Sequence, residues 1–319
     1  MRRLTALIFA FDNLLRSIIE QPFAYRQLSA RAGAKSMPDA STTRHQLRHG
    51  TSDARRPVRA VHPASPDAAK DKEFMLTLAK GLAVLGSFGR HRPAMTLAQA
   101  AQAGGLSRAT ARRVLHTLVG LGYVEQNGRQ FALSPRIMRL GFAYISSQSW
   151  IDRAVPLIKA LSERFHESCS AAILEGTEII YVARIPARRI MSTALAVGSR
   201  LPAFHSSMGR IQLGFLDDTE IWRRLKSVCI EPLTPATITD LQALHERIRD
   251  DRRQGFSIVD EELERGLRSI AVPIVDREGQ CVGAINLSTH STRTTRNALR
   301  ETFLPELKSV AEQVSALSI

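Results

Sequence analysis

The segment from 96 to 124, TLAQAAQAGGLSRATARRVLHTLVGLGYV, constrains the fold of this chain more than any other part of it. Its opening, Thr96 to Ala103, reads as a short alanine-rich helix, which the pair Gly104-Gly105 then breaks. Ser107 can cap a second helix, because its hydroxyl can accept hydrogen bonds from the first-turn amides. Two helices joined by a short glycine-containing turn are typical of a helix-turn-helix.

The second helix has one apolar face and one basic face. The apolar residues recur at the spacing of a single buried stripe: Ala111, Val114, Leu115 and Leu118. Arg112 and Arg113 lie off this stripe, and Arg108 lies at its edge in the first turn, where recognition helices usually contact bases. Arginine pairs bidentately with guanine edges or phosphate oxygens, so the helix is predicted to read DNA. The alternative is a solvated basic face on an ordinary helix.

A hairpin is expected directly after this helix. Residues 121–125 read as a strand, Asn127-Gly128 as a type I′ turn, and residues 129–133 as the return strand. Such a hairpin is a wing, on which Arg129 can reach a phosphate. The expected DNA contacts are therefore Ser107, Arg108, Thr110, Arg112, Arg113 and Arg129. Upstream, a first amphipathic helix is expected to bury the stripe Phe74, Leu78, Leu82 and Leu85.

Charge and composition divide the chain further. Residues 1–72 contain 13 Lys/Arg against 6 Asp/Glu and few large apolar side chains in their second half, so we expect a basic, largely disordered leader. A basic excess favours a nucleic-acid partner or another anionic surface. The three cysteines are far apart and form no CxxC, so no metal site, disulfide or cofactor is predicted, and reduced cytoplasmic thiols are expected. The chain lacks an apolar run long enough to cross a membrane, and no membrane partner is expected.

The C-terminal part mixes helices and strands. After the winged helix-turn-helix at 73–134, residues 135–150 read as a linker helix that carries dimer contacts or serves as a simple connector. In residues 151–319, a helix near Val155 is followed by a hairpin around 175–177 and a strand at 190–197. Helices are expected at 207–216 and 241–253, a second hairpin around 277–279, and a last helix that buries Phe303 to Val314. The predicted fold class is α+β, with a mainly antiparallel sheet flanked by helices.

One strand of this region has a polar face. Between Ala284 and His290, Asn286 and Ser288 point to one side, while Ile285 and Leu287 point to the other. Ser269 repeats the polar pattern on the neighbouring strand. A few polar groups among apolar walls are the usual composition of a small-molecule site, although a solvent-facing sheet surface has the same pattern.

The chain from Phe74 to its end resembles the IclR family of bacterial transcription regulators. The resemblance is carried by LAKGLAVLGSF, LSRATARRVLHTLVGLGYV, GSRLPAFHSSMGR and QGFSIVDEELERGLRSIAVPIVDREGQCVGAINLS. The segments SMGR and GAINLSTHSTRTT are most similar to the branch that controls protocatechuate and β-ketoadipate catabolism. Residues 1–72 lie outside the resemblance.

The resemblance implies a homodimer or homotetramer with an N-terminal winged helix-turn-helix and a C-terminal effector-binding domain. Family effectors are small organic acids or aromatic compounds. By position, the implied pocket contains Ser207, Met208, Asp260, Ser269, Asn286 and Ser288. Several relatives have Cys at the position of Ser269 and Ser at that of Asn286, so the effector need not be the same. The implied function is operator binding that responds to an aromatic or dicarboxylic acid.

Two questions remain open at the level of sequence. The carboxylate of such an effector can pair with any of four arginines: Arg184, Arg200, Arg210 and Arg268. For each of them, a surface salt bridge is the simpler interpretation. An enzyme that acts on a small organic acid, with an accessory DNA-binding domain, is the rival class. His205-Ser206-Ser207 suggests a nucleophile, but no G-x-S-x-G elbow accompanies it, so no catalytic residue is predicted.

Overall fold

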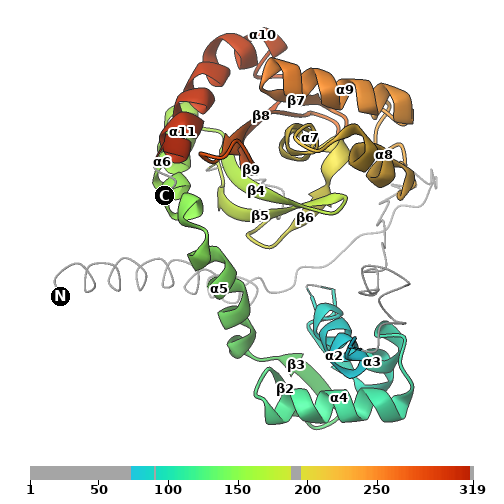
Figure 1. The fold of residues 1–319 in the computed structure, drawn as a ribbon. Helices are drawn as coiled ribbons and strands as arrows, with labels where there is room; N and C mark the ends of the chain where they lie inside the picture. The colour runs from blue at the N-terminus through green and yellow to red at the C-terminus, as the bar shows by residue number, and fades with distance from the viewer. Residues whose placement is uncertain (1–72, 90, 188–194, 317–319) are drawn as a thin grey trace, which may run out of the picture. The chain divides into compact units, whose positions relative to one another are not determined.

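The computed structural model describes residues 73–89, 91–187 and 195–316 (Figure 1). The prediction of a disordered leader at 1–72 lies outside these residues. So does most of the strand predicted at 190–197, of which the described part, 195–197, is not a strand.

The first described region is a three-helix unit with a small sheet, as the helix-turn-helix prediction requires. Its elements are α2 (Leu76–Gly86), β1 (Ala94–Thr96), α3 (Leu97–Ala103), α4 (Arg108–Gly120), β2 (Val124–Asn127) and β3 (Gln130–Leu133). β3 lies between β1 and β2 and is antiparallel to both. The helix-turn-helix followed by a wing is therefore confirmed.

Local hydrogen bonds explain where α3 and α4 begin. Thr96 and Gln99 form a capping box at the start of α3, in which each side chain accepts from the other's backbone amide. Ser107 accepts from the amide of Thr110 and so caps α4. Between the two helices Gly105 has a φ of +62°, a left-handed conformation that costs glycine little. The predicted stripe of α4 is buried: Ala111, Val114, Leu115 and Leu118.

The stripe predicted for the first helix is on the wrong face. α2 buries Ala83 and Val84, whereas Leu78 and Leu82 are 58% and 51% exposed. Leu85 is the member of the predicted stripe that packs against this core, because α2 faces α3 and α4 through Ala83, Val84 and Leu85. Gly104 shows how close this approach is, since a Cβ there would lie 3.3 Å from Val84 Cγ2.

The wing differs from the prediction by a shift of register. β2 begins at Val124, because Leu121 ends α4 and Gly122, with a φ of +76°, turns the chain. Asn127 pairs with Gln130, so the two central residues of the hairpin turn are Gly128 and Arg129. Only Gly128 has positive φ, as in type II′ turns, and the predicted type I′ turn is wrong. Arg129 therefore lies at the tip of the wing.

Two helices connect the winged unit to the sheet. A 3₁₀ turn at Pro135–Ile137 leads into α5 (Met138–Ser147), and α6 (Ser149–Phe165) follows after one residue. The helix predicted near Val155 is α6, which begins at Ser149, and Pro156 lies inside it. No residue of α5 is buried.

The second region is built on one six-stranded antiparallel sheet, with strand order β6-β5-β4-β9-β8-β7. The strands are β4 (Ser168–Glu175), β5 (Glu178–Ile185), β6 (Arg200–Pro202), β7 (Ser257–Asp260), β8 (Leu267–Val275) and β9 (Cys281–His290). The two hairpins predicted around 175–177 and 277–279 are present as β4–β5 and β8–β9. The α+β class with an antiparallel sheet is confirmed, whereas β6 and β7 were not predicted.

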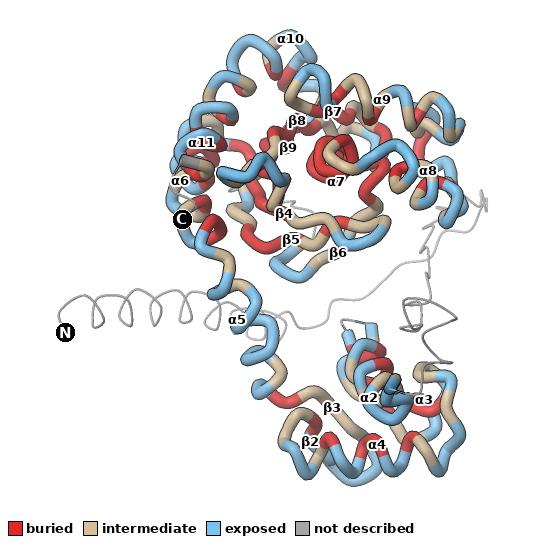
Figure 2. Tube along the Cα trace, in the orientation of Figure 1, coloured by how far each residue is buried: buried red, intermediate tan, exposed pale blue. Residues whose placement is uncertain are grey.

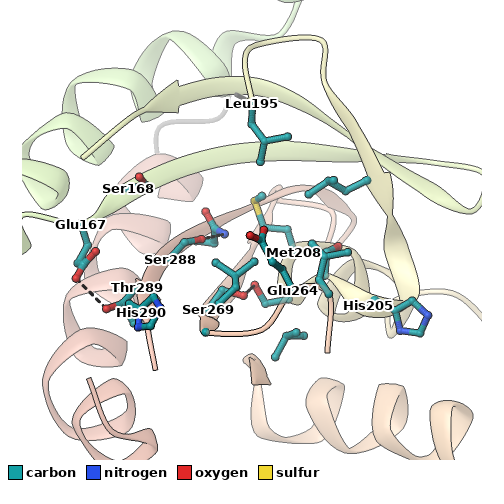
Figure 3. Close-up of a pocket in the computed structure, with 18 of the residues that line it drawn as sticks. Glu167, Ser168, Leu195, His205, Met208, Glu264, Ser269, Ser288, Thr289 and His290 are labelled. Atoms are coloured by element: carbon teal, nitrogen blue, oxygen red, sulfur yellow. Dashed lines mark hydrogen bonds between the residues drawn. The ribbon is translucent and has the colours of Figure 1, made fainter. Parts of the chain in front are cut away.

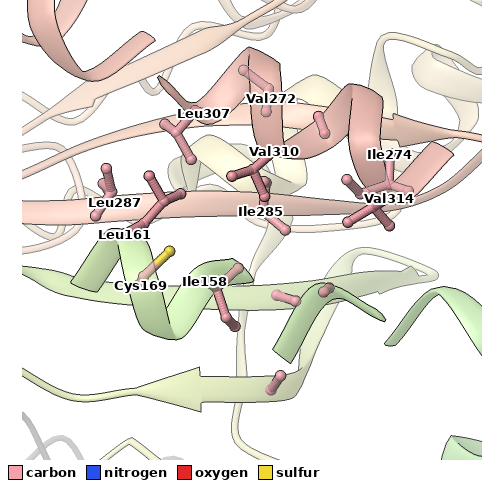
Figure 4. Packing of buried hydrophobic residues seen from close by; sticks show 14 of the residues in the cluster. Ile158, Leu161, Cys169, Val272, Ile274, Ile285, Leu287, Leu307, Val310 and Val314 are labelled. Carbon is pink, nitrogen blue, oxygen red and sulfur yellow. The ribbon is translucent and has the colours of Figure 1, made fainter. Parts of the chain in front are cut away.

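Helices cover both faces of this sheet (Figure 1). On one face, α6 and α11 (Leu304–Ala316) pack on Ile285 and Leu287 of β9, as Figure 4 shows. On the other face lie α7 (Ser207–Leu213), α8 (Asp218–Lys226) and α9 (Leu241–Gln254). All seven residues of α7 are buried, so this short helix fills the inside of the curved sheet (Figure 2). α8 was not predicted.

Candidate functional site

The outer face of α4 presents three arginines to solvent. Arg108, Arg112 and Arg113 are exposed, and no acidic partner of theirs lies in the described part of the chain. Ser107 and Thr110, by contrast, are hydrogen-bonded to each other. The Ser107 hydroxyl lies 2.9 Å from the Thr110 hydroxyl and 3.2 Å from the Thr110 amide nitrogen. These two side chains hold the start of the helix, and the arginines are its free cations.

A hollow of about 680 Å³ lies between α4, the start of α3 and the wing. Arg108 and Arg112 line it from the helix and Arg129 from the wing tip, while Arg113 is not among the lining residues. Three guanidinium groups around one hollow favour a phosphate group there. Helical periodicity places Arg113 nearly opposite the buried stripe, where α4 would project into a groove of DNA.

The sheet domain contains a cavity of about 510 Å³ on the α7 side (Figure 3). The cavity is bounded by the polar face of β8 and β9, by the start of α7 and by residues 263–267 of the loop between β7 and β8. Five of the six predicted effector-binding residues line it: Ser207, Met208, Ser269, Asn286 and Ser288. The strand alternation located this wall because Ile285 and Leu287 had an apolar core to fill on the other face.

Asp260, the sixth residue, does not line this cavity. Its carboxylate accepts hydrogen bonds from Arg268 Nε at 2.6 Å and from Arg296 Nε at 2.7 Å. Burial raises the pKa of Asp260, but the hydrogen bonds and charges of the two arginines outweigh it, and the pKa lies below its usual value. The Asp260 carboxylate thus joins β7 to β8 and to the segment after β9.

Two hydrogen bonds order the polar wall. Ser269 Oγ donates to Ser207 Oγ at 2.9 Å, and Asn286 Nδ2 donates to Ser288 Oγ at 3.0 Å. Asn286 is only 4% exposed, yet its Oδ1 has no hydrogen-bond partner among the described residues. A buried polar atom of this kind costs free energy unless something pairs with it, so the wall is suited to a ligand with hydrogen-bonding groups.

His205 is a lining residue that the sequence argument did not choose. It is 3% exposed, and its Nδ1 has no partner within the described chain. Burial, together with the charge of Arg210, lowers the pKa of His205 from 6.5 to about 4, so the imidazole is neutral near pH 7. In the sequence, only its position next to Ser206 and Ser207 indicated that His205 could line the cavity.

The structure separates the four candidate arginines. Arg210 is completely buried and pairs with Glu262, Arg268 pairs with Asp260, and Arg200 pairs with Glu178 at 3.0 Å. Arg184, by contrast, lines the cavity. Sequence could not make this distinction for Arg210, because its acidic partner Glu262 lies 52 residues away along the chain.

A buried ionic cluster joins α7 to α9 and to the loop between β7 and β8. Arg210 on α7 contacts Glu262 and lies 3.9 Å from Asp251 of α9, and its guanidinium also donates to the carbonyl of Phe204. Ser257 donates to Asp251 at 2.5 Å. Burial raises the pKa of Asp251, and the arginine charges only partly oppose this. The cluster fixes α7 against α9 and against the loop that closes the cavity.

Comparison with known proteins identifies the family. The domain described as "Bacterial transcriptional regulator IclR C-terminal" matches residues 142–316, and the "IclR helix-turn-helix domain" matches residues 77–128. The chain belongs to the IclR family. The two matches cover the described lining of the sheet-domain cavity and most of the lining of the hollow beside α4, whose Arg129 and Phe131 lie outside them.

Individual IclR-family relatives agree with this. The chain is 42% identical to the Pca regulon regulatory protein of Pseudomonas putida, over 76% of this chain and 84% of the relative. It is 31% identical to the p-hydroxybenzoate hydroxylase transcriptional activator of Acinetobacter baylyi, over 81% and 97%. A solved transcriptional regulator from Rhodococcus sp. RHA1 is 42% identical, with a TM-score of 0.67 and coverage of 76% and 98%. The expected similarity to the protocatechuate branch is confirmed.

No helix in the described residues is long and apolar enough to span a bilayer. Within the same residues, no three His, Cys, Asp or Glu side chains come together as a possible metal site.

Proposed function

We propose that this IclR-family protein is a transcription regulator whose affinity for operator DNA changes when a small aromatic or dicarboxylic acid binds in the sheet domain. The observation that carries the proposal is the cavity wall, where Asn286 Oδ1 and His205 Nδ1 are buried without partners. A ligand that pairs with both atoms removes two desolvation costs, and the apolar walls favour a carbon skeleton.

The DNA side of the proposal rests on α4 and the wing. Arg113 faces the bases, while Arg108, Arg112 and Arg129 hold phosphates in the hollow that they line. Ser107 and Thr110 complete the contact region as the cap that sets the start of the recognition helix. Backbone contacts of this kind set position and affinity, and base contacts set sequence preference.

Control of aromatic catabolism follows from the relatives. One is named for the Pca regulon and another for p-hydroxybenzoate hydroxylase, an enzyme of hydroxybenzoate chemistry. The polar wall and the volume of about 510 Å³ suit a ligand of that size. A dicarboxylic acid of the β-ketoadipate type is the second candidate.

The test is operator affinity with and without ligand. A duplex selected from random sequence by the protein itself supplies the operator, and 4-hydroxybenzoate, 3,4-dihydroxybenzoate, β-ketoadipate and adipate supply the ligands. A regulator shifts the operator Kd with at least one ligand and returns that ligand chemically unchanged. Turnover of the ligand would instead support the rival class, an enzyme with a DNA-binding domain.

We also propose that the protein acts as a homo-oligomer. Large apolar side chains are exposed on and beside α2 and on α5: Met75, Leu76, Leu78, Leu82, Met138, Leu140, Phe142 and Tyr144. Exposed apolar groups in this number mark a protein contact, and a two-fold dimer would present two copies of α4 to two half-sites. Sedimentation of the parent and of Leu78→Glu tests this, since a dimer dissociates on introduction of the charge and a monomer is unaffected.

A further inference from the structure

Arg184 on β5 is half-buried, and it differs from the arginines of the sheet domain that pair with acidic groups. Its Nη1 donates to Ser170 Oγ at 3.3 Å, and its Nε is buried without a hydrogen-bond partner among the described residues. No carboxylate in the described chain pairs with it. Arg200, Arg210, Arg268 and Arg293 each have an acidic partner.

The strand register places Arg184 beside the polar wall. Ser170 on β4 pairs with Arg184 on β5 and, on its other side, with Asn286 on β9. The three residues form one row across the sheet, on the face that the cavity occupies. Neighbouring strands are about 4.8 Å apart, so the backbone positions of Arg184 and Asn286 are separated by roughly 10 Å. A small ligand can therefore contact both side chains at once.

The guanidinium is held in place by its surroundings. It lies over the ring of Tyr181, 5.8 Å from the centroid, and Tyr181 also lines the cavity. An arginine fixed on one side by a ring and a hydroxyl keeps its remaining N–H groups for a planar anion, with less entropy to lose on binding. The charge is permanent, and its burial without an anion is unfavourable.

Most of the polar wall is uncharged, and the two charged side chains that line the cavity from the loop between β7 and β8, Glu264 and Arg265, are exposed. Ser207, Ser269, Asn286 and Ser288 are uncharged, and His205 is neutral near pH 7. Arg293, which also lines the cavity, faces the buried Glu167 at 3.3 Å. Arg265 lacks an acidic partner in the described residues too, but it is exposed at the rim. The interior thus offers one uncompensated positive charge.

We propose that Arg184 binds the carboxylate of the effector, and that the cavity consequently selects a monocarboxylic acid whose other polar groups are uncharged. This inference rests on the proposed effector site. A hydroxybenzoate meets the requirement, because its carboxylate pairs with Arg184 and its hydroxyl can pair with Asn286. A second carboxylate would be buried against serine hydroxyls and an amide without a cation, which disfavours dicarboxylic acids.

The experiment compares acids with a neutral analogue on the full-length protein. Calorimetry measures the Kd of 4-hydroxybenzoate, 3,4-dihydroxybenzoate, 4-hydroxybenzamide and adipate with the parent, Arg184→Gln, Arg184→Lys and Arg253→Gln. The parent is expected to prefer the hydroxybenzoates over the amide and adipate. Arg184→Gln should weaken acid binding roughly 10- to 100-fold, the range for a lost charged hydrogen bond, and change amide binding less than about threefold. Arg253→Gln on α9 is the matched control, because this exposed arginine does not line the cavity, and it should keep the parent's values.

The outcomes separate the two proposals. If the parent binds a hydroxybenzoate and Arg184→Gln binds it equally well, Arg184 is not the carboxylate partner, although the effector site stands. A parent that prefers adipate overturns the monocarboxylate assignment. A parent that binds none of the four compounds overturns both proposals for this cavity.

Thermal midpoints and operator affinity report whether each variant is folded. If Arg184→Gln unfolds, Arg184→Lys decides, since loss of the fork geometry should reduce the acid-to-amide preference while the charge is kept.

Discussion

Ser269 on β8 donates a hydrogen bond of 2.9 Å to Ser207 at the start of α7, and this bond ties the sheet to the helix that fills its curve. Ser269→Ala leaves the Ser207 hydroxyl buried without that donor. The expected loss is about 1 kcal/mol in the free energy of unfolding, measured with urea. Ser146→Ala on the exposed helix α5 is the matched control. An equal effect of the two substitutions would show that the Ser207–Ser269 bond is not stabilising.

Asn286→Leu removes the buried amide from the cavity wall while retaining most of its volume. We expect effector affinity to fall by roughly 1–3 kcal/mol, because a polar group of the ligand is left unpaired. Operator affinity without effector should stay nearly unchanged, since Asn286 belongs to the sheet domain. Calorimetry and an operator-binding assay measure the two quantities. Unchanged effector affinity would place the binding site elsewhere, and lost operator binding without ligand would indicate misfolding.

Arg112→Ala and Arg113→Ala should have different consequences for DNA binding. Arg112 lines the hollow between α4 and the wing, so its loss should weaken binding to all sequences alike and reduce the salt slope by about 1. Arg113 faces away from the buried stripe, so its loss should cost about 1–3 kcal/mol on the operator and relax sequence preference. Lys308→Ala on α11 is the charge control. Parent-like binding by Arg108→Ala, Arg112→Ala and Arg113→Ala at matched salt would show that α4 is not the reading helix.

Arg210→Met should destabilise the sheet domain strongly. The substitution leaves Glu262 and Asp251 buried without their shared cation, and breaking a buried ion pair typically costs about 3–5 kcal/mol. Arg223→Met, which breaks the exposed pair with Glu220, should change stability far less, because water screens the charges of that pair. Urea unfolding of both variants gives the comparison. Similar small effects would mean that the Arg210 cluster adds no more than a surface pair.

His205 predicts a specific dependence of stability on pH. Its pKa is about 4 in the folded protein and 6.5 when unperturbed, so below pH 6.5 the unfolded chain binds a proton that the folded chain does not. The contribution of His205 to the free energy of unfolding is fully present above pH 6.5 and is lost as the pH falls from 6.5 towards 4. His205→Gln should remove this contribution, which the difference between parent and variant urea midpoints reveals over that window. A difference that stays constant from pH 7 to 4 would contradict the neutral buried imidazole.

Features that depend on short-range interactions could be predicted from the sequence. The cap at Ser107, the stripe of α4, the glycine turn at 176 and the alternation from Ala284 to His290 depend on neighbours within a few residues. Each was predicted from the sequence and each is present. The alternation also identified most of the polar cavity wall, because a strand that buries one face on a core must turn the other face elsewhere.

Tertiary structure decided the rest, because the deciding contacts join residues that are distant along the chain. The face of α2 depended on small residues of α3 and α4, and the role of Asp260 on an arginine 36 residues away in sequence. The sequence alone does not distinguish Arg184 from Arg210. Only the fold shows that Glu262 neutralises Arg210, and that Arg184 lines a cavity without pairing with a carboxylate of the described chain. Pairing of charges depends on distance in space, and sequence spacing does not encode that distance once strands far apart in the sequence, such as β4 and β9, lie side by side.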